Sequence, residues 1–306
     1  MASYTYPVKH PEGTLTPEQI HALLSRSSIV AKRLAEITKM RFIADYLLSQ
    51  RFNAQGGGIY YETGEEIFAA DAPEAVAPGS AYPKTVMTRG DLAAARTAKW
   101  GLDSDVTDEK IGREGVVVLN RALNRLGNSI VKQVDSVAMA VIMAKVTSTF
   151  ASPSTWTTAG KIAEALLSIQ QTRGDLGTGL ELDTVVLKPT QWAKLVGILI
   201  DDKALPREQG NVVIAGLTPF DALGFTWTTS PFYTGANPML VDREELGGMA
   251  DENLGSPGYV RSGDVGIEAK SIRDDDTDKY TVRGRRVVVP VVTEPLAGVT
   301  LTNTAL

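Results

Sequence analysis

The sequence predicts an α+β protein whose parts are extended as well as globular. A helical period runs through residues 107–146, well beyond the length of an ordinary globular helix. Residues 57–106 hold two extended runs separated by a proline-rich stretch, and residues 263–292 alternate as a hairpin with an acidic tip. Residues 151–256 alternate helix and strand signals, which predicts a mixed sheet with flanking helices.

The composition is that of a globular protein without a cysteine framework. The 306 residues are 43% hydrophobic and 22% charged, enough for a core and unlike a disordered chain. The lack of cysteine excludes disulfides and Cys-ligated metal sites. A net charge of −5 argues against broad binding of nucleic acid. The N-terminal sequence has no secretory pattern, and the apolar run 137–144 is too short to span a membrane, so we expect a soluble protein made inside the cell.

No motif indicates catalysis, and we predict a protein that is not an enzyme. The two histidines, His10 and His21, are most simply interpreted as solvent-facing residues. A nucleophile elbow, a zinc-protease helix and a phosphate-binding loop are all absent from the sequence. The acidic tip at 274–278 resembles the start of a calcium loop, but Lys279 stands where that loop needs glycine. We therefore expect no catalytic residue, no cofactor and no metal.

The N-terminal part predicts helices that lack a local partner. Thr16 and Gln19 have the spacing of a capping box, and Pro17 suits the first helical position. A short helix is expected at 17–25 and a second from residue 28 onwards. Their apolar faces need a surface from elsewhere.

Residues 57–106 predict a two-stranded ribbon with an irregular end. Residues 59–62 and 91–106 are extended runs, and the segment between them, 65–86, is acidic and interrupted by prolines. An isolated ribbon is marginally stable in water, and its open edges invite aggregation. We therefore expect the ribbon to lie on another subunit.

A single long helix is expected after Thr107, which is a good N-cap residue. Apolar or small residues recur about 3.7 positions apart, a helical period. They are Ile111, Gly115, Val118, Ala122, Leu126, Ile130, Val134, Val137, Val141 and Ala144. A helix of about 40 residues would be roughly 55–60 Å long. Its glycines lower helix propensity, so we expect it to bend or break near one of them.

The segment after the long helix predicts a compact α/β part. The expected elements are a helix at 158–171, a strand at 182–188, a helix capped by Thr190, a loop at 205–219 and strands at 224–231 and 238–242.

Four segments, in this order, carry a resemblance to a known family: residues 42–83, 101–114, 186–195 and 283–292. Together with the order of the predicted parts, they resemble the major capsid proteins of tailed phages with the Hong Kong 97 fold, in particular those of actinobacterial phages. The resemblance covers nearly the whole chain.

The resemblance implies a division of the chain into named parts. These are an N-terminal arm (1–56), a ribbon called the E-loop (57–106), a spine helix of the peripheral domain (107–150), an axial domain (151–256), and a peripheral-domain hairpin with the C-terminal segment (257–306). In that family the E-loop lies across a neighbouring subunit, so residues 65–86 become part of an intersubunit strap. The N-terminal helices are expected to find their partner surface in the same way.

The strap supplies the candidate contact residues. They are Glu65, Glu66, Phe68, Asp71, Glu74, Val76, Tyr82 and Lys84, with the basic run Arg283, Arg285 and Arg286 of an adjacent subunit facing the acids. Some relatives join a ribbon lysine covalently to an asparagine, and Lys84 and Asn303 are the candidates here. No motif marks a catalysing glutamate, so cross-linking is not expected.

The implied function is that of a major capsid protein. Hexamers and pentamers of this chain would form an icosahedral shell, assembled in the bacterial host cytoplasm and retained in the virion, around double-stranded DNA that is not bound specifically. The segment before the ribbon is short, so a separate scaffold protein is expected, beside a portal and decoration proteins, and no membrane is involved. Two alternatives remain: an encapsulin-like compartment shell with enzyme cargo and, more remotely, a soluble hydrolase or transferase. Electron microscopy of purified particles separates them.

The acidic balance generates a prediction about DNA. We expect the free subunit to show no measurable affinity for duplex DNA at physiological salt, because non-specific binding depends on many basic contacts. Fluorescence anisotropy with a labelled duplex measures this. A specific submicromolar complex would contradict the prediction.

Overall fold

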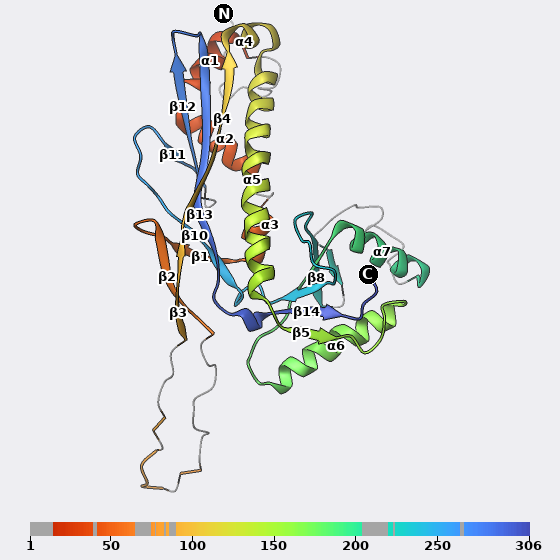
Figure 1. The fold of residues 1–306 in the computed structure, drawn as a ribbon. Coiled ribbons are helices and arrows are strands. Elements are labelled where there is room, and N and C mark those ends of the chain that lie inside the picture. The colour runs from red at the N-terminus through yellow and green to blue at the C-terminus, as the bar shows by residue number, and fades with distance from the viewer. Residues whose placement is uncertain are drawn as a thin grey trace, which may run out of the picture.

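The computed structural model describes residues 15–38, 42–64, 75–76, 78–82, 84–85, 90–203, 220–222, 224–263 and 266–306. Figure 1 shows a long unit of strands and helices, a smaller α/β unit beside its lower end, and a ribbon that leaves the long unit at the same end. The C-terminus lies in the smaller unit.

The long unit is built on a mixed sheet with strand order β1-β10-β13-β12-β11. Strand β4 also pairs with β13, over residues 279–288. The strands are β1 (Gln50–Asn53), β4 (Ala98–Thr107), β10 (Gly247–Asp251), β11 (Val260–Arg261), β12 (Ile267–Asp274) and β13 (Lys279–Val292). The predicted terminal hairpin is confirmed as β12 and β13, which pair from Ile267↔Arg286 to Asp274↔Lys279.

The N-terminal segment forms three helices: α1 (Pro17–Leu24), α2 (Ser27–Thr38) and α3 (Ile43–Leu47). The capping box is confirmed, because the Gln19 N–H donates to Thr16 Oγ1 at 3.4 Å and the Thr16 N–H donates to Gln19 Oε1 at 3.1 Å. Ile20 and Leu24 are fully buried within their own chain. The expectation that these helices pack on another subunit is therefore wrong: they join the core of this chain beside the long helix.

The predicted long helix is present, with a break at a glycine. It consists of α4 (Asp108–Glu114) and α5 (Val116–Lys145). Gly115 separates them with φ +62° and ψ −143°, a backbone conformation that a residue with a side chain rarely adopts. The expected break near a glycine is thus confirmed at this position.

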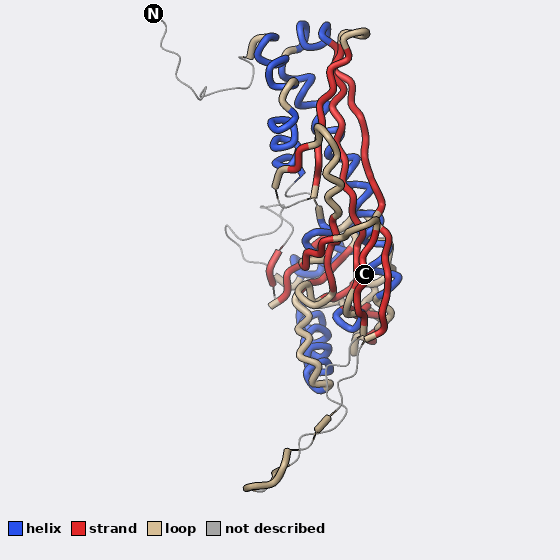
Figure 2. The backbone as a smooth tube through the Cα atoms, turned by 90° about the vertical axis from the view of Figure 1, so that its left-hand side faces the viewer, coloured by secondary structure: helices blue, strands red, loops and turns tan. Residues whose placement is uncertain are grey.

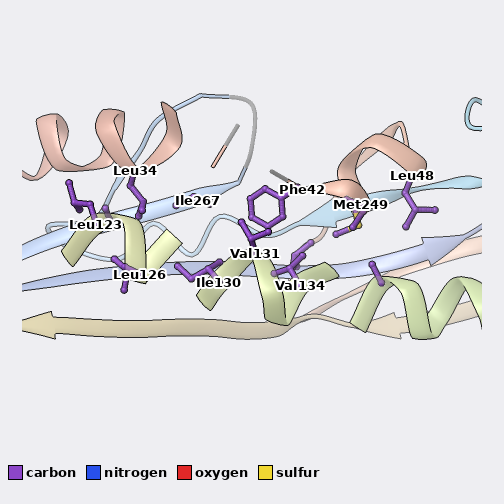
Figure 3. Close-up of a cluster of buried hydrophobic side chains, with 14 of the residues drawn as sticks. Leu34, Phe42, Leu48, Leu123, Leu126, Ile130, Val131, Val134, Met249 and Ile267 are labelled. Carbon is purple, nitrogen blue, oxygen red and sulfur yellow. The ribbon is translucent and has the colours of Figure 1, made fainter. Parts of the chain in front are cut away.

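The predicted apolar stripe is correct in the middle of α5 and wrong at its C-terminal end. Leu126, Ile130 and Val134 are buried, as expected, whereas Ala144 is exposed and Ile142 is buried instead. The buried face shifts around the helix because α5 packs against β4 and β13, against α2, and further along against α3. Figure 3 shows this core.

Helices and sheet approach closely at Gly284 of β13. A Cβ atom there would lie 2.8 Å from Leu126 Cδ2 and 3.0 Å from Leu34 Cδ2. Both α2 and α5 therefore cover the same face of the sheet at this point. Figure 2, turned by 90°, shows helices running alongside the long strands in the upper half of the molecule.

The expected ribbon is shorter than predicted. Of the extended run 91–106, only β3 (Asp91–Arg96) pairs with β2 (Gly58–Thr63), and β4 pairs with β13 from Val288↔Ala98 to Thr107↔Lys279. Thr97 is the switch point, where the N–H donates to the carbonyl of Gly57 at 3.0 Å. The long strand β13 offers β4 ten paired positions, which the short β2 cannot.

The smaller unit is a second mixed sheet with strand order β5-β14-β9-β6-β8-β7 and its own core. Its elements are β5 (Thr149–Ala151), α6 (Ala159–Asp175), β6 (Thr184–Leu187), α7 (Pro189–Asp201), β7 (Phe220–Ala222), β8 (Phe225–Thr229), β9 (Met239–Val241), a 3₁₀ turn (Pro295–Ala297) and β14 (Gly298–Thr302). The helix α7 begins at Pro189, with Lys188 as N-cap, and not after Thr190, because proline fits the first helical position. The loop predicted at 205–219 lies outside the described residues.

The sheets cross the expected boundary between the axial part and the terminal hairpin. β10, assigned to 151–256, pairs with β13 in the first sheet, and β14, assigned to 257–306, pairs with β9 and β5 in the second. The chain therefore passes between the two units more often than a linear division allows. Long-range strand pairing of this kind leaves no local signal in the sequence.

A substitution on the buried face of α5 tests this core. We expect Leu126→Asp to lower the free energy of unfolding by several kcal/mol, roughly the stability margin of a domain, because Leu126 is 1% exposed and an unpaired buried charge is costly. Urea unfolding followed by circular dichroism measures the loss. Gln133→Asp, on the exposed side of the same helix, is the matched control and should change little. A soluble, normally folded Leu126→Asp protein would contradict the burial of this stripe.

Candidate assembly interface

The β2–β3 ribbon has one packed face and one open face. Ile59, Tyr61 and Ala95 pack against a small cluster on the first sheet. The register pairs Tyr60 with Ala94 and Leu92 with Glu62, so Tyr60 and Leu92 share the opposite face. Tyr60 is 78% exposed and Leu92 is 72% exposed. Sequence reasoning missed this exposed apolar pair.

The alternation within each strand could have identified the pair, because it places these two side chains on one face once the register is known. The register depends on which residues pair and which form the connection between the strands. The sequence alone does not determine that division. The signal was therefore present but incomplete.

The ribbon is anchored to the long unit at its root. The Glu252 carboxylate accepts the Gly57 N–H at 2.9 Å and the Thr97 hydroxyl at 2.7 Å, one donor from each side of the ribbon. At the opposite end of β2, the Gly64 N–H donates to the Thr293 carbonyl at 3.2 Å. Neither edge of the ribbon pairs with another of the described strands. The β2–β3 pair is therefore held at both ends and keeps open edges (Figure 1).

Most of the predicted strap residues lie outside the part that the structure describes. Those are Glu65, Glu66, Phe68, Asp71 and Glu74. Of the remaining three, Tyr82 is 81% exposed, Lys84 is exposed and Val76 is half-buried. The Tyr82 ring is thus a further exposed aromatic group, in the connection between β2 and β3.

The predicted basic run divides between the two faces of the first sheet. Arg286 lies on the helix side, is 0% exposed, and pairs with Asp45 at 2.6 Å and Asp251 at 2.8 Å. A side chain without exposed surface cannot contact a neighbouring subunit. The expectation for Arg286 is corrected: its partners are carboxylates of its own chain, because a buried cation needs them.

Arg283 and Arg285 lie on the other face, which no described helix covers. Arg285 is 6% exposed, pairs with Glu268, and stacks under the ring of Tyr259 at 3.5 Å, so it too has partners in its own chain. Arg283 makes two bonds of 2.6 Å to Asp103 but keeps 42% of its side chain exposed. Of the three arginines, only Arg283 remains available to an acidic partner.

A shallow groove of about 440 Å³ opens on this uncovered face. Its lining residues are Lys99, Gly101, Leu102, Asp103, Tyr259, Arg283 and Arg285. Gly101 keeps the groove open, because a Cβ there would lie 3.0 Å from Arg285 Cβ. The Leu102 side chain, 49% exposed, is on the opposite face of the sheet, because Leu102 pairs with Gly284. A groove with cationic and aromatic walls suits a polypeptide that carries acidic and apolar side chains.

On the helix side, a buried charge cluster fastens α3 to the rest of the chain. Arg286 joins β13 to Asp45 of α3 and to Asp251 of β10. Asp135 of α5 accepts the N–H groups of Ala44 at 3.0 Å and Ile43 at 3.3 Å, at the start of α3. Burial raises the pKa of Asp135 to about 6, despite these two bonds. Burial also acts to raise the pKa of Asp45, but its bonds to Arg286 and Arg51 hold that pKa below the usual range.

No metal or membrane site is apparent in the described part of the chain. Within those residues, no group of three or more His, Asp or Glu could hold a metal ion. In the acidic hairpin tip, Asp274 accepts the Asp276 N–H and the Thr277 hydroxyl, which closes the turn. His21 lies 3.9 Å from Asp108, and His10 is outside the described residues. None of the described helices combines the length and hydropathy needed to cross a bilayer.

Comparisons with known proteins find similarity to phage proteins and to a virus-like particle. A family model described as phage capsid protein matches residues 91–301. The capsid structure of cyanophage P-SCSP1u is similar with TM-score 0.55 and 12% identity, over 82% of this chain and 84% of that chain. A structure of Mycobacterium phage Adephagia has TM-score 0.51 and 13% identity, over 85% and 89%. The virus-like particle from Pyrococcus furiosus has TM-score 0.52 and 11% identity, over 89% and 97%. No curated protein sequence matches.

The raised pKa of Asp135 generates a pH prediction. The folded pKa lies near 6 and the unfolded pKa near 3.8, so folding retains a proton that the unfolded chain releases. The carboxyl group's contribution is therefore fully present below about pH 4 and is lost as pH rises through 6, a change of roughly 3 kcal/mol.

We expect Asp135→Asn, which cannot ionise, to remove this part of the pH dependence. The difference in unfolding free energy between variant and wild type should shift in favour of the variant from pH 4 to pH 7. Parallel urea titrations at these pH values measure it. Asp105→Asn is the control, because Asp105 is exposed and its pKa is lowered by bonds to Thr281 and Lys279. A wild-type to Asp135→Asn difference that does not change with pH would contradict the assignment.

Proposed function

We propose that the β2–β3 ribbon and the uncovered face of the first sheet hold neighbouring subunits together. The chain belongs to the phage capsid protein family and is a major capsid protein, a subunit of the shell. Its fold is the Hong Kong 97 type. The role of such a protein is structural. The encapsulin alternative is not favoured, because the matching family model is that of phage capsid proteins.

The observation that carries the proposal is the exposed apolar face of an anchored ribbon. Tyr60, Leu92 and Tyr82 are each more than 70% exposed in the single chain. Burying a large apolar side chain stabilises by about 1.5–3 kcal/mol. Three such contacts on each subunit, repeated around a closed shell, supply a cohesive energy that the isolated chain does not use. The Glu252 anchor limits the entropy lost when the ribbon docks.

The groove beside Gly101 is the seat that we propose for the strap of a neighbour. The strap carries Glu65, Glu66, Asp71 and Glu74, and the groove offers Lys99 and Arg283 as partly exposed cations. Exposed ion pairs contribute only about 0–1 kcal/mol each, so they orient the strap while the apolar contacts hold it. Tyr259 provides the aromatic wall of that seat.

The wider assembly follows from the same proposal. Hexamers and pentamers of the chain close an icosahedral shell around double-stranded DNA, in the host cytoplasm, with a separate scaffold protein, a portal and decoration proteins as partners. The long unit serves as the peripheral domain, and the second sheet with α6 and α7 serves as the axial domain near the centres of the hexamers and pentamers. Electron microscopy of purified particles tests this: DNA-filled shells with a tail vertex are expected, and protein-filled shells would favour a compartment.

Deletion of the strap tests its role in assembly. We expect removal of residues 68–83, bridged by a short Gly-Ser linker, to leave a folded subunit by circular dichroism and to abolish stable shells in sedimentation, because those of these residues that the structure describes belong to neither core. Shells of normal thermal stability would contradict the proposal, and so would an unfolded subunit.

A finer variant separates the apolar contacts from the length of the arm. Tyr60→Ser with Leu92→Ser keeps the ribbon and removes its exposed apolar pair, so shells should dissociate at lower temperature than wild type. Ser substitution of Leu176, an exposed leucine at the end of α6, is the matched control and should leave shell stability nearer to wild type.

A further inference from the structure

The exposed charges of α5 are of one sign. Over the 30 residues of this helix, the ionisable side chains are Arg121, Arg125, Lys132, Asp135 and Lys145. All four cations are exposed, whereas Asp135 is 1% exposed. The described helices α2, α6 and α7 each carry both signs. In a chain with net charge −5, this is a local reversal.

Three of these cations form a basic stripe: Arg121, Arg125 and Lys132. At about 100° per residue they lie within roughly 40° of one another around the helix, and they span about 16 Å along it. The buried side of this part of the helix, with Leu126 and Ile130, packs toward β13. The basic stripe therefore points away from the first sheet, opposite to the groove beside Gly101.

The stripe is weakly neutralised by its own chain. Arg121 lies 3.3 Å from Glu114, and both side chains are about half exposed. In the part of the chain that the structure describes, Arg125 and Lys132 have no carboxylate within ion-pair distance. Folding thus makes little use of these charges. Three aligned, exposed cations, of which only Arg121 has a carboxylate within ion-pair distance among the described residues, suit a partner with regularly spaced negative charge.

We propose that the basic stripe of α5 faces the enclosed DNA and contacts its phosphates. This rests on the proposed function, in which the shell contains double-stranded DNA. In that case the uncovered sheet face, with its groove, points away from the DNA.

A weak contact between the stripe and DNA is consistent with the net charge of −5. Each phosphate contact contributes a slope of about −0.9 to log K against log salt, so three contacts give about −2.7. Such a contact is weak at physiological salt for one subunit, and it needs no base recognition. Repeated over the shell, it offsets the repulsion between an acidic wall and packed DNA without holding the DNA in place.

A photo-crosslinking experiment on assembled particles tests the assignment. A photo-reactive amino acid is placed at Arg125 in one variant and at Lys99, on the uncovered sheet face, in the matched control. Both positions are exposed. We expect irradiation of DNA-filled particles to attach DNA to the chain at position 125 and not at position 99.

Each result decides between the possibilities. DNA attached at position 99 and not at 125 would overturn the orientation. Attachment of position 125 to another protein chain, with no DNA, would mean that an acidic protein partner covers the stripe and would overturn the inference while leaving the shell function intact. Particles without DNA would overturn the proposed function and the inference together.

A binding measurement gives a second readout. The free subunit should bind a labelled duplex at low salt with a slope near −2.7, and Arg121→Gln, Arg125→Gln and Lys132→Gln together should abolish this binding. The control variant Lys194→Gln, Lys203→Gln and Arg261→Gln removes the same charge from exposed sites on other elements and should retain it. Equal losses in both variants would show that only net charge matters and would overturn the assignment.

Discussion

The close approach of α5 and α2 to β13 at Gly284 is the contact on which the rest of the structure depends. Leu126, Ile130 and Leu34 all lie within reach of the missing Cβ, so a larger residue would separate the helices from the sheet. Along its length β13 pairs with β12, β4 and β10, and β10 in turn holds β1. A shift of the helices at this point would therefore disturb the packing of every strand of the first sheet.

This arrangement covers one face of the sheet and leaves the other open. The helix face carries the buried Arg286, whose charge is balanced by Asp45 and Asp251 within the chain. The open face carries Arg283 and Arg285 in cross-strand pairs and has no helix among the described elements. Alternation along a single strand thus places Arg286 on the helix face and Arg283 and Arg285 on the open face.

Local signals in the sequence were sufficient for the local elements. The capping box at Thr16, the break at Gly115 and the turn between β12 and β13 each depend on residues a few positions apart. Signals were insufficient where strands far apart in the sequence pair. Strand β4 follows β3 directly but pairs with β13, and β14 pairs with β9 in the second sheet. The partners of Arg286 were missed for the same reason, because Asp45 is 241 positions away.

Exposure in the single chain distinguishes the N-terminal helices from the ribbon. The N-terminal helices and the ribbon both looked like arms in need of a partner. Ile20 and Leu24 are fully buried by their own chain, so these helices are part of the subunit, whereas Tyr60 and Leu92 remain more than 70% exposed on a ribbon that is anchored at its root. A soluble chain gains nothing from holding such a pair in water. Apolar surface that folding leaves open, on an element that folding has already positioned, is the surface that a neighbouring subunit can bury at the lowest entropic cost.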